Sequence, residues 1–123
     1  MPTFPSQPSR FAHERLDAYH VAREALAQGE TIARDLPRGY ATLADQLRRA
    51  LLAAHLGVAE AAARSGADRL ARFRCARGEA SEAAAALDAV VVLGLVPAAR
   101  VEPVVALLAR LHAMLTRLCR PER

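Results

Sequence analysis

Residues 41–63, ATLADQLRRALLAAHLGVAEAAA, carry apolar residues on two sides of one predicted helix. Steps of three, four and seven residues define a first stripe, which consists of Leu43, Leu47, Ala50, Ala54, Val58 and Ala61. A second, nearly opposite stripe consists of Leu52, Leu56, Ala59 and Ala63. A helix that is apolar on two sides is buried on two sides. A four-helix monomer covers only one face of each helix well, so the second stripe predicts a subunit interface at Leu52 and Leu56.

The same periodicity predicts three more helices, at about 13–34, 67–93 and 98–120. Gly29 lies on the apolar stripe of the first of these and would allow a close helix approach. The connections at 36–39 and 64–67 are short and contain glycine or proline, which favours antiparallel neighbours. The predicted fold class is all-α, an antiparallel up-down-up-down four-helix bundle.

One domain accounts for the whole chain of 123 residues. We expect the bundle to occupy residues 11–120. Residues 1–10, MPTFPSQPSR, are rich in proline and serine, and their composition is typical of a flexible tail.

Three positions bear on where the predicted helices end. Ser65, followed by Asp68, resembles a capping box at the start of the third helix. Gly94 fits the glycine position that follows a helix C-terminus. Pro103 removes a backbone hydrogen bond and should distort the fourth helix, unless the regular helix starts only near Glu102.

The composition suits closely packed helices, with 53% hydrophobic residues and only 4% aromatic ones. Cys75 and Cys119 lie far apart in the sequence, which favours two reduced, half-buried thiols in a cytoplasmic protein. We find no secretory signal. The most apolar stretch, Ala83 to Val96, is too short to span a bilayer and contains Asp88, so we expect no membrane partner.

We find no catalytic constellation and expect neither enzymatic activity nor a cofactor. His13, Asp17, His20 and Glu24 fall on one face of the first predicted helix, but they form a single imperfect copy of a metal-binding pattern. A solvated polar face is the favoured interpretation, with no metal. Nucleophile elbows and phosphate-binding glycine loops are absent from the sequence.

Positive charge is concentrated between residues 64 and 77. All 17 basic residues of the chain other than histidine are arginines, and the formal net charge is +4. The cluster consists of Arg64, Arg69, Arg72, Arg74 and Arg77. Asp68 is the one acid among them, so the cluster alone carries the whole net charge. A solvated face and a nucleic-acid-binding patch both remain open. For phosphate contacts, Arg72 and Arg74 are the preferred candidates, since Arg69 and Arg77 lie nearer the apolar stripe.

Two carboxylates, Glu60 and Glu82, lie among small apolar residues. Acid–base catalysis is conceivable, but pairing with arginine is more common, and Arg48, Arg49 and Arg77 are available. We therefore predict buried ion pairs that fix the helix register.

Several short motifs resemble one known family. They are Leu16-Asp17-Ala18-Tyr19, Gln46-Leu47-Arg48-Arg49-Ala50, Val58-Ala59-Glu60, Arg72-Phe73 and Ala76-Arg77-Gly78. Together they resemble the four-helix bundle proteins encoded in intervening sequences of bacterial 23S ribosomal RNA genes. The resemblance extends over about residues 11–119. The chain departs from the family pattern at His55, Gly57, Ala61 and Glu79.

The resemblance implies a ring-shaped homopentamer with no known catalysis. It extends to the accessory barrel proteins of diversity-generating retroelements, which bind nucleic acid and a reverse transcriptase. Two hypotheses follow for this chain. It is a homo-oligomeric scaffold that binds RNA or DNA through arginines, or it is a structural or protein-interaction module whose protein partner the sequence does not identify.

Overall fold

The computed structural model describes residues 9–121. These residues form four α-helices and two short 3₁₀ helices and contain no strand. In chain order the elements are η1 (Ala12–Arg15), α1 (Asp17–Arg34), η2 (Arg38–Tyr40), α2 (Ala41–Ala62), α3 (Gly66–Val92) and α4 (Ala98–Leu118). The predicted all-α, four-helix architecture is confirmed. Most of the predicted tail, residues 1–8, lies outside the described residues.

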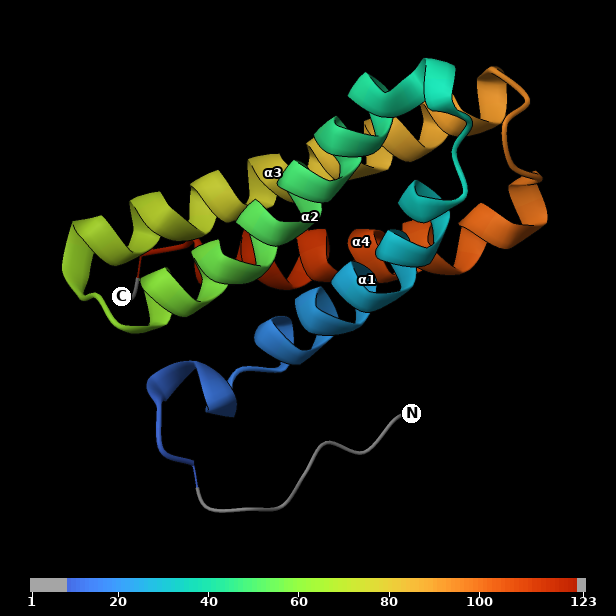
Figure 1. Ribbon diagram of the computed structural model, residues 1–123. Coiled ribbons are helices and arrows are strands. Elements are labelled where there is room, and N and C mark those ends of the chain that lie inside the picture. The colour runs from blue at the N-terminus through green and yellow to red at the C-terminus, as the bar shows by residue number, and fades with distance from the viewer. Residues whose placement is uncertain (1–8, 122–123) are drawn as a thin grey trace.

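The helices run alternately up and down, and each packs against two neighbours (Figure 1). α1 contacts α2 and α4, and α3 contacts the same two helices, whereas the backbones of diagonally opposed helices do not approach each other closely. The contact between α2 and α3 is the most extensive. The C-terminal end of α4 lies at the same end of the bundle as the α2–α3 turn, as expected for antiparallel neighbours (Figure 1).

The core is built from leucine, valine and alanine around one ring, that of Phe73. On α2, the first stripe is buried as predicted, with Leu43 only partly covered. Leu51, which the stripe did not include, is buried as well, and it packs where Gly29 leaves room for it. The small residues allow close contact between helices: a Cβ added at Gly57 would lie 3.2 Å from the Cβ of Ala76.

Only the C-terminal end of α3 has the predicted structure. Ser65 occupies the N-cap position, but its side chain makes no capping hydrogen bond, so the predicted capping box is wrong. Asp68 contacts arginines instead. At the other end, Gly94 has a φ of +70°, which glycine adopts without strain. The Gly94 N–H donates to the Val91 carbonyl and the Leu95 N–H to the Val90 carbonyl, which is a Schellman motif.

The first and fourth helices differ from expectation in detail. Leu16 is extended, with φ −94° and ψ 123°, so the predicted first helix is split into η1 and α1. The Glu14 carboxylate accepts the Phe11 N–H at 3.2 Å and helps to hold η1 in place. α4 is continuous through Pro103, so a start near Glu102 is ruled out.

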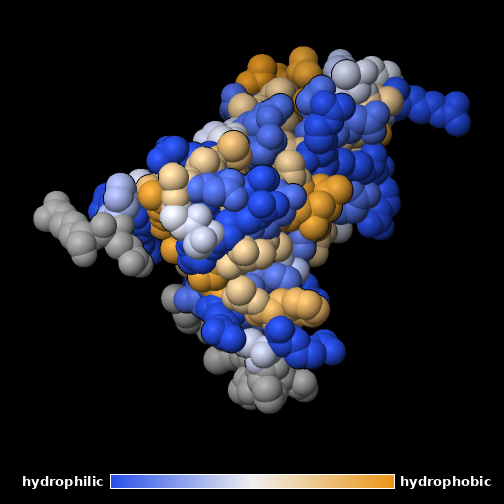
Figure 2. All heavy atoms as spheres, turned by 90° about the vertical axis from the view of Figure 1, so that its left-hand side faces the viewer, coloured by the Kyte–Doolittle hydropathy of each residue, from blue (hydrophilic) through white to orange (hydrophobic). Residues whose placement is uncertain are grey.

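Hydrophilic and apolar side chains are interspersed on the end of the bundle that carries the α2–α3 turn (Figure 2). The helices formed by the described residues are too short or too polar to span a bilayer. Cys75 is exposed and Cys119 is buried, so the prediction of two half-buried thiols is wrong for both.

Candidate nucleic-acid interface

Two of the five clustered arginines are held by carboxylates. Arg64 Nη1 lies 3.5 Å from Asp68 Oδ2. Arg72 Nη1 donates to Glu60 Oε2 at 3.3 Å, which ties α3 to α2. The Nε of Arg72 is 3.4 Å from Asp68 Oδ1 but is not oriented to form a hydrogen bond with it, so this contact is an ion pair only. Arg72, a preferred candidate for phosphate contacts, is thus the most heavily paired arginine of the cluster.

Arg69 contacts the end of α2. Its Nη1 donates to the Ala62 carbonyl at 3.4 Å, one of the last carbonyls of α2, which lack a partner within that helix. Its guanidinium carbon lies 5.1 Å from the ring centroid of Phe73, within the range of a cation–π contact. Arg69 therefore joins the two helices at their turn.

Arg74 and Arg77 have no carboxylate partner among residues 9–121. Arg74 is exposed and Arg77 is half-buried. Residues two apart on a helix point about 200° apart, so Arg74 and Arg72 face different sides of α3. Arg72 lines the groove between α2 and α3, together with Cys75 and Glu79. The five arginines therefore do not form one surface.

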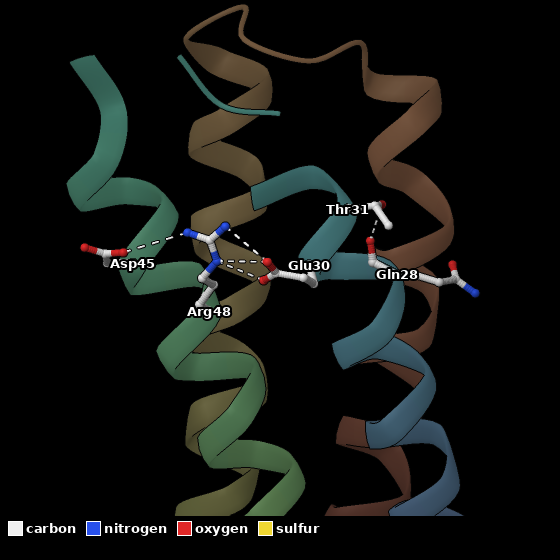
Figure 3. Close-up of polar contacts among 5 residues, drawn as sticks. All are labelled: Gln28, Glu30, Thr31, Asp45 and Arg48. Atoms are coloured by element: carbon white, nitrogen blue, oxygen red, sulfur yellow. Dashed lines mark hydrogen bonds and ion pairs between the residues drawn. The ribbon is translucent and has the colours of Figure 1, made fainter. Parts of the chain in front are cut away.

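The predicted register-fixing pairs are present only in part. Arg48 of α2 binds Glu30 of α1 through two nitrogens: Nε lies 2.8 Å from Oε2, and Nη2 lies 3.1 Å from Oε1 (Figure 3). Arg48 also lies 3.9 Å from Asp45. The hydrogen bonds from Arg48 lower the pKa of the Glu30 carboxyl. The side chains of Arg48 and Glu30 are 40% and 36% exposed, so the pair is not buried as predicted.

Glu60 pairs with Arg72, at an exposed site, rather than with Arg48 or Arg49. Glu82 has no arginine partner among the described residues and instead faces Glu79. Burial, and then the charge and hydrogen bond of Glu82, raise the pKa of Glu79, while the charge of Arg49 acts in the opposite direction. The prediction of buried arginine pairs is therefore wrong for Glu60, Glu82 and Arg49.

The second stripe of α2 is uncovered in the single chain. Leu52 is 46% exposed and Leu56 is 51% exposed. Leu56 borders the α2–α3 groove, whose floor and walls include Ala53, Gly57 and Ala76. Leu56 at the edge of this groove and Leu52, one turn away on α2, are exposed apolar side chains of the kind found at subunit contacts, and the contact stays a prediction.

The predicted histidine row is broken, because His13 belongs to η1 and not to α1. No three potential metal ligands come together within residues 9–121. Tyr19 instead lies between two imidazoles, with ring centroids 4.4 Å from His13 and 4.6 Å from His55. Burial lowers the pKa of His55, and the charges of Arg23 and His13 lower it further. This ring cluster was not predicted from the sequence.

No protein-family model matches the chain, and a search of the curated proteins finds no relative. The resemblance to the intervening-sequence family therefore stays a prediction. Two of its departures have local consequences. Gly57 packs directly on Ala76, and Ala61 is completely buried.

Proposed function

We propose that the protein is a non-catalytic, homo-oligomeric four-helix scaffold that binds the phosphate backbone of RNA or DNA. The observation that carries this proposal is the positive charge left over between residues 60 and 77. Asp68 and Glu60 balance two of the five arginine charges, so three positive charges have no carboxylate partner. Arginine guanidinium groups form bidentate contacts with phosphate, so an uncompensated group of them favours a polyanionic partner.

Assembly through Leu52 and Leu56 would strengthen weak binding. Each copy adds the same uncompensated arginines, and a strand that touches several copies gains avidity without new contacts. The resemblance to the intervening-sequence family supplies the subunit number, five. The departures at His55, Gly57, Ala61 and Glu79 concern α2 and α3, which are the helices that carry both proposed surfaces.

One observation favours the alternative, a structural module without nucleic-acid binding. Arg69 and Arg72 make contacts that hold α3 against α2, and Arg64 of the turn pairs with Asp68 at the start of α3. Arginines used in this way need no external partner. The two functions differ in whether the remaining arginines bind a polyanion.

A titration with labelled RNA and DNA oligonucleotides at low and moderate salt tests the proposal. Binding to phosphates releases counterions, so the affinity should fall linearly with salt on logarithmic axes and depend little on base sequence. If no oligonucleotide binds at low salt, the proposal fails and the structural module is the better description.

A further inference from the structure

A continuous groove runs between α3 and α4, on the side of α3 away from α2. Near its middle, it is lined by Ala80, Ser81, Ala84, Val105, Ala109 and His112. Towards the α3–α4 connection, it continues between Asp88 of α3 and Glu102 of α4. Leucines and valines of both helices lie among the lining residues, with smaller side chains at Ala80, Ala84, Ala98 and Ala109 between them.

Helical spacing places two arginines on the flank of α3 that lines this groove, beyond the lining residues Ala80 and Ser81. Arg74, Arg77, Ser81, Ala84 and Asp88 follow one another at steps of three, four, three and four residues, which defines one flank of a helix. This flank of α3 thus continues past Ser81 to Arg77 and Arg74, near the C-terminus of α4, and we call the stretch from Arg74 to Ser81 the basic half. The stretch between Asp88 and Glu102, near the α3–α4 connection, is the acidic half.

The α4 wall has the same polarity. Glu102, Val105, Ala109, His112 and Thr116 also follow at steps of three, four, three and four. Along α4 towards its C-terminus, the side chains on this flank thus change from the carboxylate of Glu102 to the imidazole of His112 and then to the hydroxyl of Thr116. The Thr116 hydroxyl donates to the His112 carbonyl at 2.9 Å, so it is already engaged, whereas the His112 side chain is exposed.

We propose that the basic half of the α3–α4 groove holds the phosphodiester backbone of a single nucleic-acid strand. This inference rests on the proposed nucleic-acid binding and locates it. Arg74 and Arg77 contact the phosphates, and Ser81 and His112 add hydrogen-bond donors from the two walls. Asp88 and Glu102 repel phosphate and end the site. The basic half extends about 10 Å along α3, from Arg74 to Ser81, so each subunit covers a short stretch of the strand.

A matched pair of double variants tests this assignment. Arg74→Ala/Arg77→Ala and Arg64→Ala/Arg72→Ala remove the same formal charge from the same region. The probes are labelled oligouridine, oligothymidine and a duplex of mixed sequence. We expect Arg74→Ala/Arg77→Ala to weaken single-strand binding about tenfold or more and to reduce the salt slope by roughly 1.4, because two phosphate contacts are lost. Arg64→Ala/Arg72→Ala should weaken binding less than about threefold, because carboxylates already compensate those charges.

The acidic half provides a gain-of-binding test. Asp88→Asn/Glu102→Gln removes the repulsion and should tighten binding of both single strands. Oligouridine and oligothymidine should bind alike, since the backbone alone is read, and the duplex should bind more weakly. Circular dichroism verifies that each variant keeps its helices. If Arg74→Ala/Arg77→Ala does not fold, the affinity of Asp88→Asn/Glu102→Gln for the single strands tests the assignment.

The outcomes separate the two proposals. If the wild type binds no oligonucleotide, both fail. If it binds but Arg64→Ala/Arg72→Ala loses as much affinity as Arg74→Ala/Arg77→Ala, the groove is the wrong site while nucleic-acid binding stands. The basic half could instead bind the acidic half of a second copy. Arg74→Ala/Arg77→Ala would then change the mass of the assembly and leave the affinity for oligonucleotides unchanged. This result would also overturn the inference.

Discussion

Two glycines inside helices have opposite surroundings, and the difference predicts opposite effects of alanine. A Cβ at Gly78 on α3 would meet no atom within 4 Å. Because alanine is favoured over glycine in a helix by about 1 kcal/mol, Gly78→Ala should raise the free energy of unfolding by about 0.5–1 kcal/mol. Gly29→Ala brings the same gain, but its Cβ would collide with the Cδ1 of buried Leu51, and overpacking costs about 1–3 kcal/mol.

Urea denaturation of the two variants checks this contrast. Gly78→Ala should be more stable than the wild type and Gly29→Ala less stable. Equal shifts of the two variants in the same direction would contradict the close packing of α1 on Leu51.

The lowered pKa of His55 predicts a pH dependence of stability. The unfolded chain binds a proton near pH 6.5, while the folded protein takes it up only at lower pH. The contribution of His55 to the free energy of unfolding is therefore fully present above about pH 6.5 and is lost as the pH falls below that value. We expect His55→Gln to show a smaller loss of stability between neutral and mildly acidic pH than the wild type, by denaturation at each pH. Parallel pH profiles would contradict the burial of this imidazole.

Long-range polar partners were the least predictable feature of individual residues. Glu30 and Arg48 lie 18 residues apart, and only the packing of α1 on α2 brings them together. Asp68 was read as a capping residue from its spacing to Ser65, but Arg64 and Arg72, one turn away on either side, compete for its carboxylate. Sequence spacing within one helix does not show whether the Asp68 carboxylate caps the helix or pairs with an arginine.

α4 contains a proline that costs it a hydrogen bond. Pro103 is the sixth residue of the helix and is exposed. The carbonyl of Ala99 therefore lacks its partner within the helix and faces solvent. Pro103→Ala restores the N–H donor and the helical propensity, so it should raise the free energy of unfolding by about 1 kcal/mol or more, measured by thermal or urea denaturation. A destabilised variant would mean that the proline shapes α4 in a way its neighbours require.

α3 shows how a charge cluster in the sequence divides in space. The five arginines fall within 14 consecutive residues and were read as one patch. In the structure, Arg72 lines the α2–α3 groove, Arg64 and Arg69 make contacts at the α2–α3 turn, and Arg74 points to a different side of α3 from Arg72. The helical periodicity that identifies the apolar stripe also predicts this separation, because residues two apart on a helix, such as Arg72 and Arg74, do not share a face.

The bundle itself was predictable because periodicity and turn residues agree along the whole chain. Predicted and observed α-helix bounds differ by at most two residues, apart from the start of α1, where Leu16 interrupts the helix. The pairing of the arginines was not predictable, because it depends on helix register. The number of copies is not encoded in any periodicity, and here it comes from the resemblance.

The second stripe of α2 predicts how the assembly can be taken apart. Leu52→Glu/Leu56→Glu should dissociate it while the helices remain, because buried unpaired charges cost several kcal/mol each. Val92 and Leu93 are also exposed, at the end of α3, so Val92→Glu/Leu93→Glu is the matched control and should leave the mass unchanged. Dissociation by the control alone would place the contact at that end of the bundle.

The mass of the wild-type particle tests the account most directly. Light scattering at micromolar concentration should give a multiple of the 13.2 kDa chain mass, and five copies if the ring predicted from the resemblance is correct. A particle of 13.2 kDa would contradict the account, because a monomer would leave Leu52 and Leu56 uncovered and would remove the avidity on which the proposed binding of nucleic acid depends.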